Sequence, residues 1–265
     1  MIRDITLGQY YPSKSIIHGL DARTKIIATI LFIVELFIVN NFYGFLLAAI
    51  SIGMIIVISK VPVRFIFKGL KPVFIIIIFT FIINVLMIDG RVLFSFSIFT
   101  ITYEGLYRAF FMAARLMLLI IGSSLLTLTT KPLSLTDGIE KLLRPFEIIK
   151  VPSHEIAMMM TIALRFIPTL LEETDKIMKA QQARGADFET GGIIKRAKNL
   201  IPILVPLFIS AFRIAQDLAM AMEARCYRGG KGRTRMNEIK YTRRDVIAAI
   251  VLVVFLFLMI GTRYI

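Results

Sequence analysis

The sequence predicts an all-α integral membrane protein with about five transmembrane helices and three further amphipathic helices. The chain of 265 residues is 57% hydrophobic and has a mean hydropathy of +0.77, whereas globular domains are about 45 to 50% apolar. Several apolar segments approach the roughly 20 residues that a membrane-spanning helix needs. The net charge of +14 falls mainly between these segments, where it stays outside the hydrocarbon.

Five apolar segments are predicted to cross the membrane as helices. They are residues 22–39, 42–59, 71–89, 106–129 and 246–262. Residues 92–102 alternate apolar and polar side chains, as a strand or an interfacial segment does. Because this stretch is too short to span, we expect an external loop that lies on the membrane surface.

The distribution of basic residues predicts the orientation. Residues 131–244 hold 20 of the 32 Lys and Arg, whereas the opposite side has little more than Arg91 and Arg263. Because positive loops are retained in the cytoplasm, we expect the N-terminus and residues 131–244 inside the cell and the C-terminus outside. The chain then divides into a region with four spans at 1–130, the cytoplasmic region, and a C-terminal span at 245–265.

The predicted cytoplasmic region is apolar as well as charged. Residues 156–171 and 200–212 could be mistaken for spans, and Arg165 and Arg213 lie within or beside them. A charge at the centre of a spanning helix costs roughly 2.5 to 3.5 kcal/mol, which does not by itself exclude a span. The basic linker 172–198 would be outside if both segments crossed, against the positive-inside rule. We therefore place both segments at or below the cytoplasmic membrane surface.

Helical periodicity predicts three amphipathic helices in this region. The first covers residues 133–150. The second begins with Ser153 as its N-cap and ends at Arg184, where Gly185 is a natural left-handed cap. The third begins after a glycine pair and runs to about Arg228, before a second glycine pair. Prolines inside the two long helices remove backbone hydrogen bonds and are hinge candidates, namely Pro168, Pro202 and Pro206.

Both long helices end in Ala, Arg and a small residue. The two motifs comprise Ala183, Arg184 and Gly185, and Ala224, Arg225 and Cys226. A long cation between small residues can dock closely on a partner while its guanidinium reaches a carboxylate or carbonyl. An arginine near a helix C-terminus also complements the helix dipole without any partner. The presence of two copies favours two similar receptor sites.

With these motifs, its apolar spans and its two long helices, the chain resembles the transmembrane T component of energy-coupling factor transporters. These are ABC-class importers of vitamins and transition-metal ions, and the resemblance covers nearly the whole chain. Cys226 departs from the glycine or other small residue that is common at its position. The resemblance implies a multi-pass scaffold in a prokaryotic cell membrane that is not itself an enzyme.

The resemblance also implies partners and roles for residues. The partners are two ABC ATPase subunits, which bind ATP and Mg²⁺, and a substrate-binding S component, while the chain itself holds no cofactor. Arg184 and Arg225 would end coupling helices that sit in grooves of the two ATPases. The candidates for contact with the S component are apolar residues of the first two amphipathic helices, namely Leu135, Ile139, Leu142, Leu143, Phe146, Ile156, Met160 and Ile167.

The sequence offers little for an enzyme. It contains no G-x-x-x-x-G-K-[ST], G-x-S-x-G or H-E-x-x-H pattern. His18 and His154 precede predicted helices, where we expect capping or solvent contact, and a single cysteine excludes a cysteine-rich metal site. Nucleic-acid binding is not expected, because cytoplasmic loops account for the positive charge.

A self-sufficient permease is the alternative function. Polar or ionisable residues that face inward usually line a substrate path through a membrane, and here the candidates are Glu35, Asn84, Arg108 and Arg115. Glu35 and Arg115 could equally form a structural ion pair between the first and fourth spans.

Overall fold

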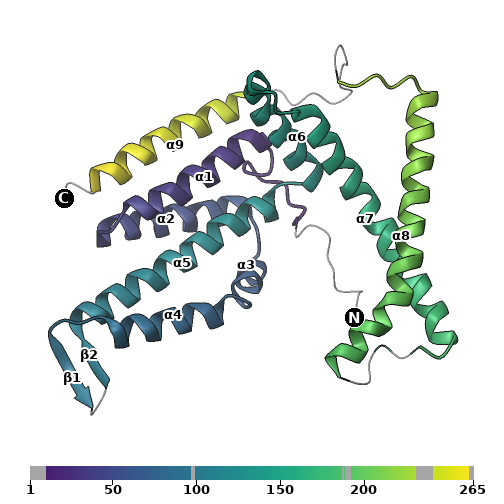
Figure 1. Ribbon diagram of the computed structural model, residues 1–265. Helices are drawn as coiled ribbons and strands as arrows, with labels where there is room; N and C mark the ends of the chain where they lie inside the picture. Colours follow the sequence, from purple (N-terminus) through teal and green to yellow (C-terminus); the bar gives the residue numbers. More distant parts are fainter. Residues whose placement is uncertain (1–9, 97–98, 187, 189–191, 231–240, 263–265) are drawn as a thin grey trace. The chain divides into compact units, whose positions relative to one another are not determined.

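The computed structural model describes residues 10–96, 99–186, 188, 192–230 and 241–262, and it is built almost entirely of helices (Figure 1). The chain forms two compact units. Gly8–Gly138 and Glu238–Ile265 make up the first, called here the bundle unit. The described residues of Ile139–Asn237 make up the second, called here the long-helix unit. The predicted all-α fold class is confirmed.

The bundle unit is organised around its longest helix, α5 (Tyr103–Thr129). This helix packs against four others, and α9 (Arg243–Gly261) packs against the first of them. The four are α1 (Ala22–Ile38), α2 (Phe42–Ser59), α3 (Val63–Leu70) and α4 (Phe74–Met87). Leu36, Ala48, Leu128 and Met259 are among the buried core residues. Large apolar side chains are exposed along α2, α4 and α9, as on a surface that faces lipid.

Polar contacts join the starts of α1 and α9. The Asp245 carboxylate accepts a hydrogen bond from the Asp21 N–H at 2.7 Å and completes a capping box with Thr242. Nearby, the Lys25 ammonium donates to the carbonyl of Thr129 at 2.9 Å, which ties the end of α5 to α1. These contacts bring three helix ends together at one end of the bundle unit.

The end of α2 belongs to the same group of helix ends, because the Ser13 hydroxyl donates to the Ser59 carbonyl at 2.9 Å. Another contact lies at the opposite end of the bundle unit, where α1 and α9 end and α2 begins. The Asn41 amide, between α1 and α2, donates to the Thr262 carbonyl after α9 at 3.0 Å. Successive long helices of this unit therefore run in alternating directions.

Two segments of the bundle unit differ from the expectation. The predicted third span is occupied by α4 and is preceded by the short helix α3, with a bend of 59° between them. Pro72 lies at the bend, and it has no N–H to donate to the Lys68 carbonyl. The expected external loop contains an antiparallel hairpin of β1 (Val92–Phe96) and β2 (Phe99–Thr102).

By length and composition, five helices of the described chain could cross a membrane, or six if α3 and α4 together form one span. They are α2, α5, α9, α7 (Ser153–Ala183) and the Lys198–Ala224 part of α8 (Ile193–Ala224). The sequence-based set instead contains α1, with 17 residues, and α4, with 14. Either set makes the chain a multi-pass membrane protein.

The first predicted amphipathic helix is split in two. Residues Pro132–Leu143 form α6, and Arg144–Ile149 form the 3₁₀ helix η2. Pro145 lies where the α-helix changes to the 3₁₀ helix, and it has no N–H to donate to the Lys141 carbonyl. The prediction of one continuous helix over residues 133–150 is therefore wrong.

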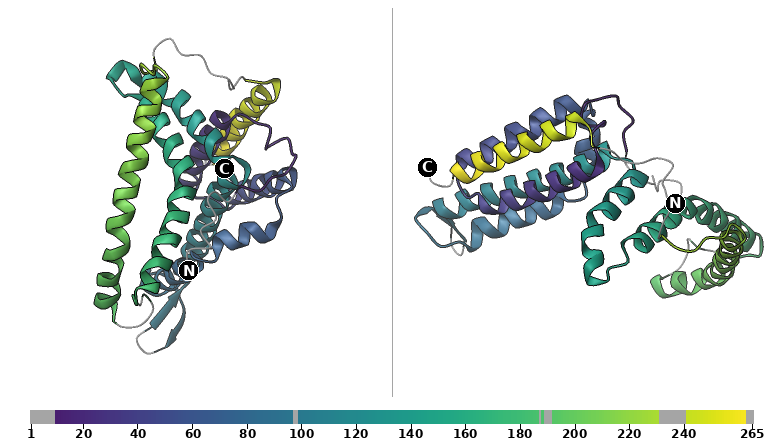
Figure 2. Two further views of the ribbon diagram at one scale, coloured as in Figure 1. Left: turned by 90° about the vertical axis from the view of Figure 1, so that its right-hand side faces the viewer. Right: turned by 90° about the horizontal axis from the view of Figure 1, so that it is seen from above.

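The two long helices of the long-helix unit run in opposite directions and lie side by side (Figures 1 and 2). Pro152 is the N-cap of α7, so the expected N-cap Ser153 is instead its first residue. The buried Ser153 hydroxyl donates to the carboxylate of Glu147. Both helices continue through their internal prolines.

Candidate functional site

The first Ala-Arg motif closes α7 with a Schellman cap. Gly185 has a φ of 86°, and its N–H donates to the Gln182 carbonyl at 2.9 Å, while the Ala186 N–H donates to Gln181 at 3.0 Å. These are the two hydrogen bonds of that motif. No atom lies within 4 Å of where a Cβ at Gly185 would stand. The backbone conformation, not lack of space, therefore favours glycine here.

The second motif closes α8 with the same cap. The Cys226 N–H donates to the Glu223 carbonyl at 2.8 Å, and the Tyr227 N–H donates to Met222 at 3.0 Å. Cys226 occupies the left-handed position with a φ of 55°, which costs a residue with a side chain about 1–2 kcal/mol. The helix thus ends at Ala224, and the prediction that it extends to about Arg228 is wrong, because the cap forms before the glycine pair.

The caps place Arg184 and Arg225 in equivalent positions at the two helix ends. Each is the exposed C-cap residue, and neither side chain has a hydrogen bond or ion pair within the described residues. Since α7 and α8 are antiparallel, the two arginines lie at opposite ends of the helix pair (Figure 1). With 32 residues in α8 and about 1.5 Å per residue, their separation is on the order of 50 Å.

The end of α7 is tied to the proline segment of α8. The Gln181 side-chain amide donates to the Pro202 carbonyl at 3.4 Å. That carbonyl lacks its usual partner within the helix, because Pro206 has no N–H. Sequence reasoning did not find this role for Gln181, because the contact depends on how the two helices pack.

The end of α8 is held by His154 at the start of α7. The Tyr227 hydroxyl lies 3.4 Å from Nε2 of His154, and Nδ1 of the same ring lies 3.2 Å from the Glu140 carboxylate. A Cβ at Gly230 would lie 2.5 Å from the ring. His154 is therefore a structural bridge between helix ends.

The predicted apolar contact candidates differ in exposure. Phe146 is exposed, whereas the remaining seven are half-buried, namely Leu135, Ile139, Leu142, Leu143, Ile156, Met160 and Ile167. Next to Phe146, η2 presents Ile148 with 90% exposure and Ile149. An exposed apolar face also follows α8 and comprises Ile201, Leu204, Val205, Phe208, Ile209 and Phe212. The hydropathy of 200–212 signalled this face, but the predicted contacts omitted it.

The polar residues considered for a permease do not form a common site. The suggested Glu35–Arg115 ion pair is wrong, because the Arg115 guanidinium donates to the Val39 carbonyl at 2.9 Å. Glu35 is 3% exposed, and neither of its carboxylate oxygens has a partner in the described chain. The Asn84 amide donates to a carbonyl of its own helix.

Comparison with known proteins places these features in a family. The family model CbiQ, described as a cobalt transport protein, matches residues 13–236. A protein of Ruminiclostridium cellulolyticum is 57% identical over 265 residues, which cover 100% of this chain and 99% of that protein; it is named energy-coupling factor transporter transmembrane protein EcfT. Proteins with the same name from Clostridium kluyveri and Bacillus subtilis are 58% and 46% identical. They match 99% and 97% of this chain, and 98% of each relative is covered. The resemblance is confirmed, and the chain belongs to the EcfT family, the multi-pass transmembrane components of energy-coupling factor transporters.

Proposed function

We propose that this chain is the scaffold through which two ATPase subunits move a substrate-binding S component, with Arg184 and Arg225 as the two contact points. The observation that supports this most is that two exposed arginines lie at opposite ends of one helix pair on identical backbone caps. Their separation, on the order of 50 Å, exceeds the roughly 30 Å diameter of a small domain. Two separate subunits can therefore each receive one arginine.

Each guanidinium would bind its ATPase through carboxylate or carbonyl oxygens, which suit its planar array of donors. ATP and Mg²⁺ would be held by the ATPases, and this chain would not be catalytic. The Gln181 contact and the His154 cluster tie each helix end to the other helix. A displacement at one arginine would therefore move both helices, with Pro168, Pro202 and Pro206 as hinges.

The S component would bind to apolar surfaces, most of them in the long-helix unit; of the predicted contact residues only Leu135 belongs to the bundle unit. The exposed face of α8 and the side chains of η2 offer such surfaces, together with the eight predicted contact residues. Substrate choice, whether vitamin or transition-metal ion, would lie in the S component.

The predicted orientation, with the N-terminus and residues 131–244 in the cytoplasm and the C-terminus outside, is part of the proposal. Two observations support it. The starts of α1 and α9 meet the ends of α2 and α5 at one end of the bundle unit. Lys14, Lys60 and Arg244 lie at that same end, as the positive-inside rule requires of the cytoplasmic side.

The test replaces the arginines in the complete transporter reconstituted in liposomes. The R184A/R225A variant should lose ATP-driven uptake and co-purification of the ATPases, while it keeps membrane insertion and the S component. Loss of coupling in either single variant would show that the two sites are not redundant. The matched control is R165A/R213A, which removes two exposed arginines from the middle of the same helices and should keep the ATPases bound.

Undiminished uptake and ATPase binding in R184A/R225A would refute the proposal. Equal loss in R165A/R213A would also refute it, since the effect would then follow the positive charge of the helices and not their ends.

A further inference from the structure

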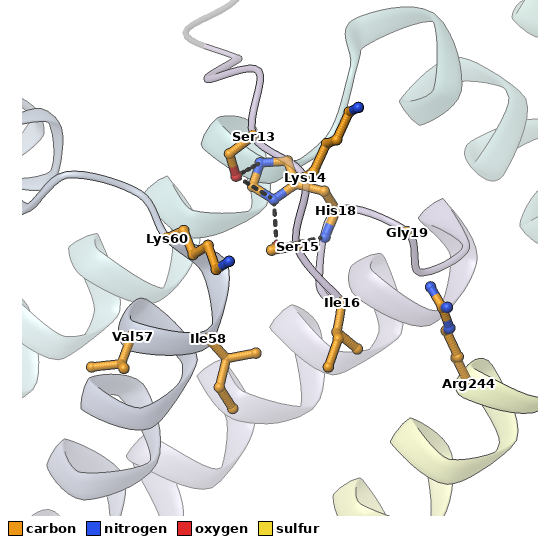
Figure 3. Close-up of a pocket in the computed structure, with 10 residues that line it drawn as sticks. All are labelled: Ser13, Lys14, Ser15, Ile16, His18, Gly19, Val57, Ile58, Lys60 and Arg244. Carbon is orange, nitrogen blue, oxygen red and sulfur yellow. Dashed lines mark hydrogen bonds between the residues drawn. The ribbon is translucent and has the colours of Figure 1, made fainter.

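A cavity of about 690 Å³ opens at the end of the bundle unit, between the N-terminal loop, the end of α2 and the start of α9 (Figure 3). Three cations line it, namely Lys14, Lys60 and Arg244, and no acidic side chain is among the lining residues. All three side chains are exposed, and in the described chain none makes a hydrogen bond or ion pair. The cavity thus concentrates positive charge that nothing in the described protein neutralises.

Hydrogen bonds hold the loop that forms one wall of the cavity. The Ser15 hydroxyl lies 2.7 Å from Nδ1 of His18, whose Nε2 lies 3.0 Å from the Tyr11 carbonyl. Burial lowers the pKa of His18 below its ordinary value. The shift favours the neutral imidazole, and the positive charge of the cavity comes from the three cations.

Two backbone features bring the cations close to the cavity. Lys60 is the C-cap of α2 in a left-handed conformation, with a φ of 56°. Gly19 lies beside the Arg244 guanidinium, which is 3.4 Å from where a Cβ at Gly19 would stand. In Figure 3, Lys60 and Arg244 lie on either side of the loop that carries His18, and the Lys14 side chain extends upward from that loop.

The cavity has apolar as well as cationic lining residues. Ile16 and Val57 are 60% and 77% exposed, and Ile58 is also exposed. In Figure 3 these apolar side chains lie below Lys14, Lys60 and His18 and at about the height of Arg244. Cations next to exposed apolar side chains match a phosphate headgroup and its acyl chains.

We propose that this cavity binds an anionic glycerophospholipid, with the phosphate among the three cations and the acyl chains along the three apolar residues. Free phosphate would satisfy the cations but would leave the exposed apolar side chains uncovered, so these side chains favour the lipid. The bound lipid joins the N-terminal loop to the ends of two helices. The site is independent of the arginine motifs.

The test uses the full chain in its purified transporter in detergent, titrated with phosphatidylglycerol and with phosphatidylcholine of the same acyl chains. Native mass spectrometry counts the lipids that each complex retains. The wild-type complex should retain phosphatidylglycerol in preference to phosphatidylcholine. The K14Q/K60Q/R244Q variant should bind phosphatidylglycerol on the order of 100-fold more weakly, since each basic residue near an anionic lipid contributes roughly fivefold.

The matched control is R64Q/K68Q/K71Q, which removes the same residue types, all exposed, from α3 and its C-cap. It should keep the preference for phosphatidylglycerol. An equal loss in the control would overturn the proposal, because binding would then follow diffuse charge. A wild-type complex with no preference for phosphatidylglycerol would overturn it as well.

Two further arms separate lipid from free phosphate. Inorganic phosphate at tens of millimolar should not displace phosphatidylglycerol, and displacement would reassign the cavity to a soluble phosphate. The V57S/I58S variant keeps every charge and should retain phosphatidylglycerol several-fold less well. Unchanged retention of phosphatidylglycerol in V57S/I58S would refute the role of the apolar residues in the site. This variant still tests the proposal if K14Q/K60Q/R244Q fails to fold.

Discussion

The C-terminal ends of α7 and α8 have the same backbone conformation, but different residues form it. Both helices close with the same pair of hydrogen bonds and present an arginine as the C-cap. At the first end a glycine takes the left-handed position, whereas at the second end a cysteine takes it with a φ of 55°. The first end is tied to the neighbouring helix by Gln181, and the second by Tyr227 and His154.

The residues of each short motif have two separate functions. The small third residue is explained by the left-handed cap, which is a requirement of the helix itself. The arginine lacks a side-chain partner in the described chain, so it is the part of the motif that is free to bind another subunit. Substitutions at the third residue should therefore change helix-end stability, whereas substitutions of the arginine should change partner binding.

The largest effect is expected from Gly185→Val. A β-branched residue at a φ of 86° is strongly disfavoured, so the last turn of α7 should lose about 2 kcal/mol of stability. Hydrogen exchange measured by mass spectrometry should show faster exchange at residues 181–186. Gly192→Ser is the control, because Gly192 is the N-cap of α8 with a φ of −68° and serine suits that position. Similar exchange in both variants would contradict the cap assignment.

An intermediate effect is expected from Gln181→Leu. This change leaves the Pro202 carbonyl without its donor and should destabilise the helix pair by about 1 kcal/mol. Chemical denaturation in detergent measures the change in the free energy of unfolding. Gln182→Leu, at the neighbouring exposed residue, should have little effect. If the two variants lost the same stability, the contact between α7 and α8 would not be a source of it.

The smallest effect is expected from Cys226→Gly, and it should be stabilising. Glycine relieves the left-handed strain at the end of α8 but loses more entropy on folding, which leaves a net gain of about 0.5–1 kcal/mol. Cys226→Ala should show no gain, because alanine has the same strain. Slower hydrogen exchange at 222–227 in the glycine variant alone would confirm the cap. A gain in stability in the alanine variant would show that the cysteine thiol, and not the left-handed conformation, destabilises the end of α8.

Much of the fold follows from local signals in the sequence. The apolar segments 22–39 and 42–59 became α1 and α2 nearly residue for residue, because hydropathy and the Asn40-Asn41 turn are local. The cap at Gly185 was also predictable from residue type. The cap at Cys226 was not, because a cysteine gives no indication of a positive φ.

The prolines show why local signals are insufficient elsewhere. Pro72 and Pro145 lie at breaks between helices, whereas Pro168, Pro202 and Pro206 lie inside continuous ones. For Pro206, the donor that compensates its missing N–H is the Gln181 side chain of the preceding helix, α7, and not a residue of α8. Whether a proline ends a helix thus depends on packing that a single segment does not encode.

The contact between Asp21 and Asp245 has a consequence for how the protein is made. The buried N–H at the start of α1 is satisfied by a carboxylate 224 residues later in the chain. At about 5–20 residues per second, the ribosome needs roughly 10 to 45 s to add the stretch between them. Throughout that time the Asp21 N–H lacks its native acceptor, although the Asp21 side chain already caps α1 through the Arg23 N–H. The contact between α1 and α9 therefore forms only when synthesis is nearly finished.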